Sequence, residues 1–180
     1  MRFDSIALAA VALAVAGPVL HVDADGDGLP DTVAVSHGRL HIVTRSGVLS
    51  AAAPRGGVLD GAMRVRGLDG ALLLVRFGSK LAITDAVYRV TGDSLQRVHV
   101  RGGGTDALVR AGGSASFTDF DCGRAPLTVE QITAEPNGSR WDETVLTYRL
   151  GARGLVPQQI QRISVSGQAA SKRRCTLLGR

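Results

Sequence analysis

The stretch Asp23-Ala24-Asp25-Gly26-Asp27-Gly28-Leu29-Pro30-Asp31 places four carboxylates at positions 1, 3, 5 and 9 of a nine-residue run, with two glycines between them. Ca²⁺ takes several oxygen ligands at about 2.3–2.6 Å, and a tightly curled loop points alternate side chains inward. Without a cation these carboxylates would repel one another. The spacing therefore predicts a calcium loop. The expected ligands are the side chains of Asp23, Asp25, Asp27 and Asp31, the backbone carbonyl of Leu29, and water.

An EF-hand and a metal-free turn are the two other interpretations of this loop. An EF-hand would carry a glutamate at position 12, where this chain has Ala34. A turn rich in Asp and Gly needs no ion, because both residue types favour tight turns. Turn chemistry does not require a carboxylate at every second position, however, so we favour the metal.

The residues around the loop have the pattern of short strands. Residues 19–22 precede it, and residues 32–36 and 39–44 follow it as two β-prone runs around His37-Gly38. This order, with the segment VDADGDGLPDTVAV, resembles the FG-GAP/VCBS repeat over residues 19–36. That repeat is the blade unit of β-propellers like those of integrin α-subunits, and the resemblance implies Ca²⁺ bound in an inter-strand loop.

Later segments look like degenerate copies of the opening unit. RVRGLDGALLLV (64–75) and FTDFDCGRAPLTV (117–129) can each be aligned with HVDADGDGLPDTV (21–33). Tyr88 and Leu95 have the same spacing as Tyr148 and Leu155. Repeats of about 50 residues are typical of propeller blades. We therefore expect three units in one domain, 17–180. Their expected bounds are 17–57, 58–111 and 112–170, followed by a basic tail at 171–180.

The later units have lost most of the acidic set. The second keeps Asp69 and the third keeps Asp119 and Asp121, so one strong calcium site is expected. Propellers typically close with about four to eight blades, and three units are too few. We therefore expect an all-β fold of blade-like antiparallel hairpins, arranged as a partial propeller or as a curled sheet or sandwich. A ring completed by other copies of the chain is the alternative.

The N-terminus has features of a secretory signal peptide. The apolar run 6–15 is too short to span a bilayer comfortably, and Ala14-Val15-Ala16 has the small-x-small form of a cleavage site. Asp4 dilutes the positive charge expected near the start. We expect removal of residues 1–16 and a secreted or extracytoplasmic protein. The alternative is an N-terminal strand or helix retained in a cytosolic protein.

The chain contains two cysteines, Cys122 and Cys175. An even number of cysteines in an exported chain favours a disulfide, which would tie the C-terminal tail to the body of the fold. Two buried free thiols are the alternative.

The chain carries a formal charge of +5 and has a sequence pI near 10.0. A basic balance indicates attraction to anionic surfaces and does not define a fold. We expect an anionic cell-surface polymer or protein as the partner, with no specific nucleic acid and no membrane span. The clearest basic run is Lys172-Arg173-Arg174, which a solvated tail would also explain.

Signatures of catalysis are missing from the sequence. It contains no G-x-S-x-G, Walker A or HExxH motif. Trp141 precedes the acidic pair Asp142-Glu143, but adjacent strand residues point to opposite faces and cannot easily flank one bond. His21, His37 and His41 are interpreted as surface residues. The expected function is an exported, calcium-stabilised, non-catalytic binding or structural module. An exported hydrolase with an active site assembled from distant loops is the alternative.

Overall fold

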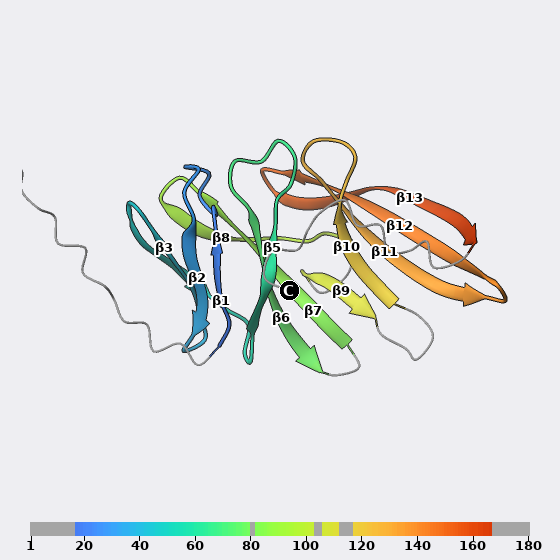
Figure 1. Ribbon diagram of the computed structural model, residues 1–180, viewed down its shortest axis with the longest axis horizontal. Coiled ribbons are helices and arrows are strands. Elements are labelled where there is room, and N and C mark those ends of the chain that lie inside the picture. Colours follow the sequence, from blue (N-terminus) through green and yellow to red (C-terminus); the bar gives the residue numbers. More distant parts are fainter. Residues whose placement is uncertain (1–16, 80–81, 103–105, 112–116, 167–180) are drawn as a thin grey trace, which may run out of the picture.

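The computed structural model describes residues 17–79, 82–102, 106–111 and 117–166 (Figure 1). The expected signal peptide, the basic run at 172–174 and Cys175 lie outside these residues, so those interpretations stay predictions. The described residues form strands and turns without any helix. The expected all-β fold is therefore confirmed. No helix able to cross a membrane is found in the part of the chain that the structure describes.

In the part of the chain that the structure describes, the strands form three antiparallel sheets, built mainly from consecutive hairpins. The first sheet contains β1 (Val19–Val22), β2 (Asp31–Ser36), β3 (Arg39–Thr44) and β4 (Gly47–Ala52). The second contains β5 (Val58–Met63), β6 (Leu72–Ser79), β7 (Ala82–Thr91), β8 (Ser94–Val98) and β9 (Leu108–Ala111). The third contains β10 (Phe117–Cys122), β11 (Thr128–Asn137), β12 (Arg140–Gly151) and β13 (Gly154–Ser166).

Each sheet lies within one of the three units expected from the sequence. The second sheet departs from a simple meander, because β8 pairs with residues 87–91 of β7 while β9 pairs with residues 82–85 of the same strand. The turn at His37-Gly38 shows how local chemistry sets these hairpins. Both residues have positive φ, 49° and 72°, as a two-residue type I′ turn requires.

The second sheet is buried on both faces, and β6 shows this most clearly. Alternate side chains of a strand point to opposite faces. Leu72 and Leu74 pack against the third sheet, whereas Leu73 and Val75 pack against the first. All four side chains are at most 1% exposed. The uninterrupted apolar run is explained by this two-sided burial, since a strand with one face in water would alternate apolar and polar residues.

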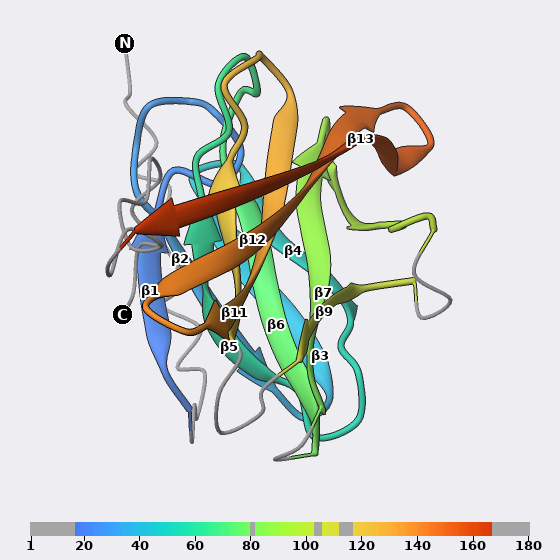
Figure 2. The same ribbon diagram turned by 90° about the vertical axis from the view of Figure 1, so that its right-hand side faces the viewer.

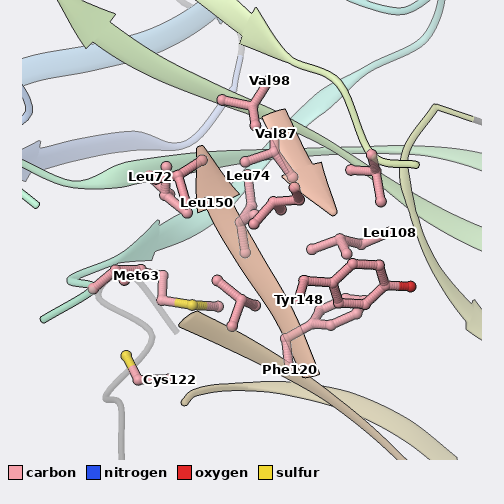
Figure 3. Packing of buried hydrophobic residues seen from close by; sticks show 14 residues of the cluster. Met63, Leu72, Leu74, Val87, Val98, Leu108, Phe120, Cys122, Tyr148 and Leu150 are labelled. Carbon is pink, nitrogen blue, oxygen red and sulfur yellow. The ribbon is translucent and has the colours of Figure 1, made fainter. Parts of the chain in front are cut away.

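Figure 3 shows the core between the second and third sheets, which the large apolar side chains of both sheets fill. The second sheet supplies Met63, Leu72, Leu74, Val87, Val98 and Leu108, and the third supplies Phe120, Cys122, Tyr148 and Leu150. Figure 2 shows β12 and β13 running obliquely across β6 and β7. The three sheets therefore stack in chain order with apolar cores between them, and none closes into a ring.

Two buried tyrosines join neighbouring sheets by hydrogen bonds. The hydroxyl of Tyr88 on β7 donates to the carbonyl of Ala52 at the end of β4, at 2.8 Å. The hydroxyl of Tyr148 on β12 donates to the side chain of Gln131 at 3.0 Å, and that side chain donates to the carbonyl of Val109 on β9 at 2.9 Å. Burial raises the pKa of both tyrosines. Tyr88 therefore faces the first sheet and Tyr148 faces the second. The repeated Tyr–Leu spacing marks equivalent positions in the second and third sheets.

We predict that Leu73→Ala and Leu74→Ala each lower the free energy of unfolding by about 2–5 kcal/mol, because each opens a cavity in a different core. Chemical denaturation measures the loss. Val48→Ala is the control, since Val48 is 50% exposed and its truncation should cost little. A large loss for only one of the two leucines would contradict the packing of the second sheet between the other two.

Asp142 on β12 receives two side-chain hydrogen bonds on an exposed surface. Ser164 on β13 donates to one carboxylate oxygen at 2.8 Å, and Asn137 on β11 donates to the other at 2.7 Å. These bonds favour the ionised form. They lower the pKa of Asp142, and the bond from Ser164 has the larger effect.

We predict that Ser164→Ala raises the pKa of Asp142 toward its ordinary value near 3.8. A carboxyl whose pKa is lowered by folding stabilises the protein above the unfolded-state pKa, and this contribution is lost as the pH falls through the folded-state pKa. Carboxyl-carbon NMR shifts followed through an acid titration measure the change. Ser94→Ala, in a hairpin of the second sheet, should leave the Asp142 titration unaltered.

Candidate metal site

The loop between β1 and β2 brings three carboxylates together. Asp23, Asp25 and Asp27 each offer an oxygen, and these oxygens lie within 4.8 Å of one another. Two oxygens bound to one Ca²⁺ at about 2.3–2.6 Å are separated by at most about 5.2 Å. The three side chains can therefore provide part of the ligand shell of one Ca²⁺. Within the described residues, no other group of acidic, His or Cys side chains converges in this way.

Backbone N–H groups fix the orientation of these carboxylates. Gly26 donates to Asp23 at 2.8 Å, Asp27 donates to Asp25 at 3.1 Å, and Leu29 donates to Asp27 at 2.7 Å. In each case the acceptor is Oδ1, so Oδ2 of each carboxylate accepts none of these backbone bonds. Bonds of this kind also shape turns that hold no ion. The feature that turn chemistry does not explain is the convergence of three negative charges.

Gly26 and Gly28 give the loop its curl. Their φ angles are +88° and +85°, in the left-handed region that glycine enters without a Cβ penalty. The two glycines therefore let the backbone curl, as the sequence predicts.

Asp31 occupies a different position from the other three aspartates. It is 3% exposed, and its Oδ2 accepts the N–H of Ala24 at 2.8 Å and that of Asp25 at 3.3 Å. Burial raises its pKa, while the hydrogen bond from Ala24 opposes that effect. Asp31 lies outside the cluster of three and holds the start of the loop. Its direct ligation of Ca²⁺, like that of the Leu29 carbonyl, stays a prediction.

The β1–β2 loop packs against the β5–β6 loop of the second sheet. A Cβ added to Gly26 would lie 2.9 Å from both the Asp69 Cβ and the Gly70 nitrogen. A Cβ added to Gly70 would overlap the carbonyl of Ala24. One guanidinium nitrogen of Arg64 lies 3.8 Å from Oδ2 of Asp23. The sequence did not indicate this contact, although it did align the two loops as equivalent segments.

The β10–β11 loop of the third sheet completes a stack of three equivalent loops, seen along the upper edge of Figure 1. The N–H of Leu127 donates to the carbonyl of Arg66 at 2.7 Å. A Cβ added to Gly67 would lie 3.2 Å from the Pro126 Cβ. The three segments aligned in the sequence therefore lie side by side at one end of the molecule.

These loops line a shallow, open hollow of about 610 Å³, here called the three-loop hollow. Its lining comes from all three sheets and contains three arginines and two aspartates. The lining residues are Asp23, Gly26, Arg64, Val65, Arg66, Leu68, Asp69, Gly70, Cys122, Gly123 and Arg124.

The other residues singled out in the sequence lie elsewhere or have no metal-binding arrangement. Nδ1 of His21 pairs with the hydroxyl of Thr32 at 3.3 Å. Glu143 is buried and Asp142 is exposed, as opposite strand faces require. Cys122 ends β10 beside the three-loop hollow, and because Cys175 lies outside the described residues the disulfide stays a prediction.

No family model, curated protein or solved structure matches this chain. The resemblance to the FG-GAP/VCBS repeat therefore remains a prediction from the sequence.

We predict that Gly70→Ala lowers the free energy of unfolding by about 3 kcal/mol or more, because it adds a steric overlap to left-handed strain. Gly92→Ala is the matched control. Gly92 also has a positive φ, 55°, but an added Cβ would meet no atom within 4 Å. It should therefore lose only about 1–2 kcal/mol. Equal losses by chemical denaturation would contradict the close contact between the first two loops.

Proposed function

We propose that this chain is an exported, calcium-stabilised, non-catalytic binding or structural module with a basic surface. The observation that carries the proposal is the convergence of Asp23, Asp25 and Asp27 in one loop, with candidate oxygens within 4.8 Å. Three adjacent carboxylates repel one another, and a dication removes this repulsion while using the oxygens as ligands.

Calcium would stabilise more than its own loop. Gly26 of this loop lies against Asp69 and Gly70 of the second sheet. An ion that fixes the first loop therefore also favours the contact between the first and second sheets. At the affinities of extracellular calcium modules, millimolar Ca²⁺ adds about 1 kcal/mol to folding. This magnitude fits a structural ion.

Charge supports the binding part of the proposal. The chain carries a formal charge of +5, which favours association with anionic partners. Exposed arginines gather at the loop end, where Arg64, Arg66 and Arg124 line the three-loop hollow. The proposed partner is an anionic cell-surface polymer or protein, and Lys172, Arg173 and Arg174 remain predicted contacts outside the described residues.

We predict that isothermal titration calorimetry detects Ca²⁺ binding to the wild-type protein and that Asp25→Asn weakens it about tenfold or more, because one anionic ligand is lost. Asp93→Asn is the control, since Asp93 lies exposed in the hairpin between β7 and β8. Equal binding heats for wild type and Asp25→Asn would rule the loop out as the site.

A further inference from the structure

We propose that the three-loop hollow is a calcium-dependent binding site for an acidic glycan, with its arginines contacting two or more sulfate or carboxylate groups. This inference rests on the proposed function, because it uses the calcium loop as one wall of the site. It adds the place where the anionic partner binds and the chemical groups that are recognised.

The first argument is the placement of the arginines. Arg64 and Arg66 come from the β5–β6 loop and Arg124 comes from the β10–β11 loop, and all three line the same hollow. Guanidinium groups bind oxyanions through paired, charge-assisted hydrogen bonds. Arginines from two loops around one hollow suit a ligand with several oxyanion groups better than a single small ion.

The second argument is that the backbone carrying these arginines is fixed. The carbonyl of Arg66 accepts the N–H of Leu127 at 2.7 Å, which ties the second loop to the third. Gly67 lies against Pro126 in the same contact. Side chains held on fixed backbone lose less conformational freedom on binding.

The third argument concerns calcium and the sign of the local charge. The lining holds three arginines and two aspartates, a formal charge of +1. Asp25, Asp27 and Asp31 of the same loop change this to −2, and a bound Ca²⁺ brings it to 0. The ion therefore removes the net negative charge that would oppose an anion at this end of the molecule.

The contact between Arg64 and Asp23 is a second reason why anion binding should depend on Ca²⁺. The two side chains are 3.8 Å apart, and the Arg64 side chain is 64% exposed. An exposed pair at this distance is weak and easily exchanged. Ca²⁺ held by Asp23 competes with Arg64 for that carboxylate and weakens this pairing.

Two other hollows of the molecule lack this charge pattern. One, of about 420 Å³, lies beside the β2–β3 turn, and its lining contains no Lys, Arg, Asp or Glu. The other, of about 270 Å³, lies on the third sheet, where Arg124 is the only basic residue and is offset by Glu130. Of these three hollows, the three-loop hollow is the one lined by several arginines.

Calorimetry with two defined probes tests the site. Sucrose octasulfate presents sulfates and trigalacturonate presents carboxylates, while maltotriose is the uncharged control. We expect both charged probes to bind the full chain in Ca²⁺, with affinity falling as salt is added. Removing Ca²⁺ should weaken binding about tenfold, as the change in local charge requires. Calcium-dependent binding of either charged probe supports the site, and binding of maltotriose with equal affinity overturns it.

The double variant Arg66→Gln/Arg124→Gln removes two arginines of the hollow. It should bind the probes about tenfold or more weakly. Arg39→Gln removes one exposed charge at the other end of the first sheet and should keep wild-type affinity. Denaturation curves establish that each variant is folded. Equal losses in both variants would indicate attraction by overall charge and overturn the site.

Calcium calorimetry on the same samples separates this inference from the proposed function. The double variant should still bind Ca²⁺, because it retains all three clustered carboxylates. A wild-type protein that binds Ca²⁺ and neither charged probe overturns the glycan site and leaves the calcium module intact. Probe binding without any Ca²⁺ binding overturns the calcium module and the calcium dependence together.

Discussion

The structure depends on the burial of one sheet between two others. In β6, Leu72 and Leu74 face the third sheet, while Leu73 and Val75 face the first. Apolar burial is the main favourable contribution to folding, and a central layer provides it on both faces. The outer sheets each have an inner face to bury, so neither needs a ring of blades to form a core.

This stacking places the three loops at one end of the molecule. Each sheet begins with a hairpin whose loop lies at that end, so stacking the sheets also stacks the loops. Gly26, Gly67 and Gly70 allow the close approach, because a Cβ at each position would press on the neighbouring loop. These glycines are therefore required for the packing between sheets as well as for the local turns.

Charge at the loop end links the proposed ion to the proposed ligand. The clustered aspartates and the arginines of the three-loop hollow meet at Asp23, which belongs to the cluster of three carboxylates and also pairs with Arg64. A cation on this carboxylate would change the electrostatics of the hollow. Calcium can therefore have a structural role and a role in recognition through a single side chain.

The sequence by itself determined the all-β class, the hairpin at His37-Gly38 and the clustering of Asp23, Asp25 and Asp27, because strand periodicity, turn chemistry and nearby carboxylates act over a few residues. Only the tertiary structure decided that Asp31 bonds to the loop backbone, and that Arg64, Arg66 and Arg124 share a hollow. The orientation of Asp31 is set within its own loop, where the same spacing suits a metal ligand as well as an acceptor of backbone N–H groups. The shared hollow depends on which faces of the sheets pack together, and pairings between distant segments leave no local pattern in the sequence.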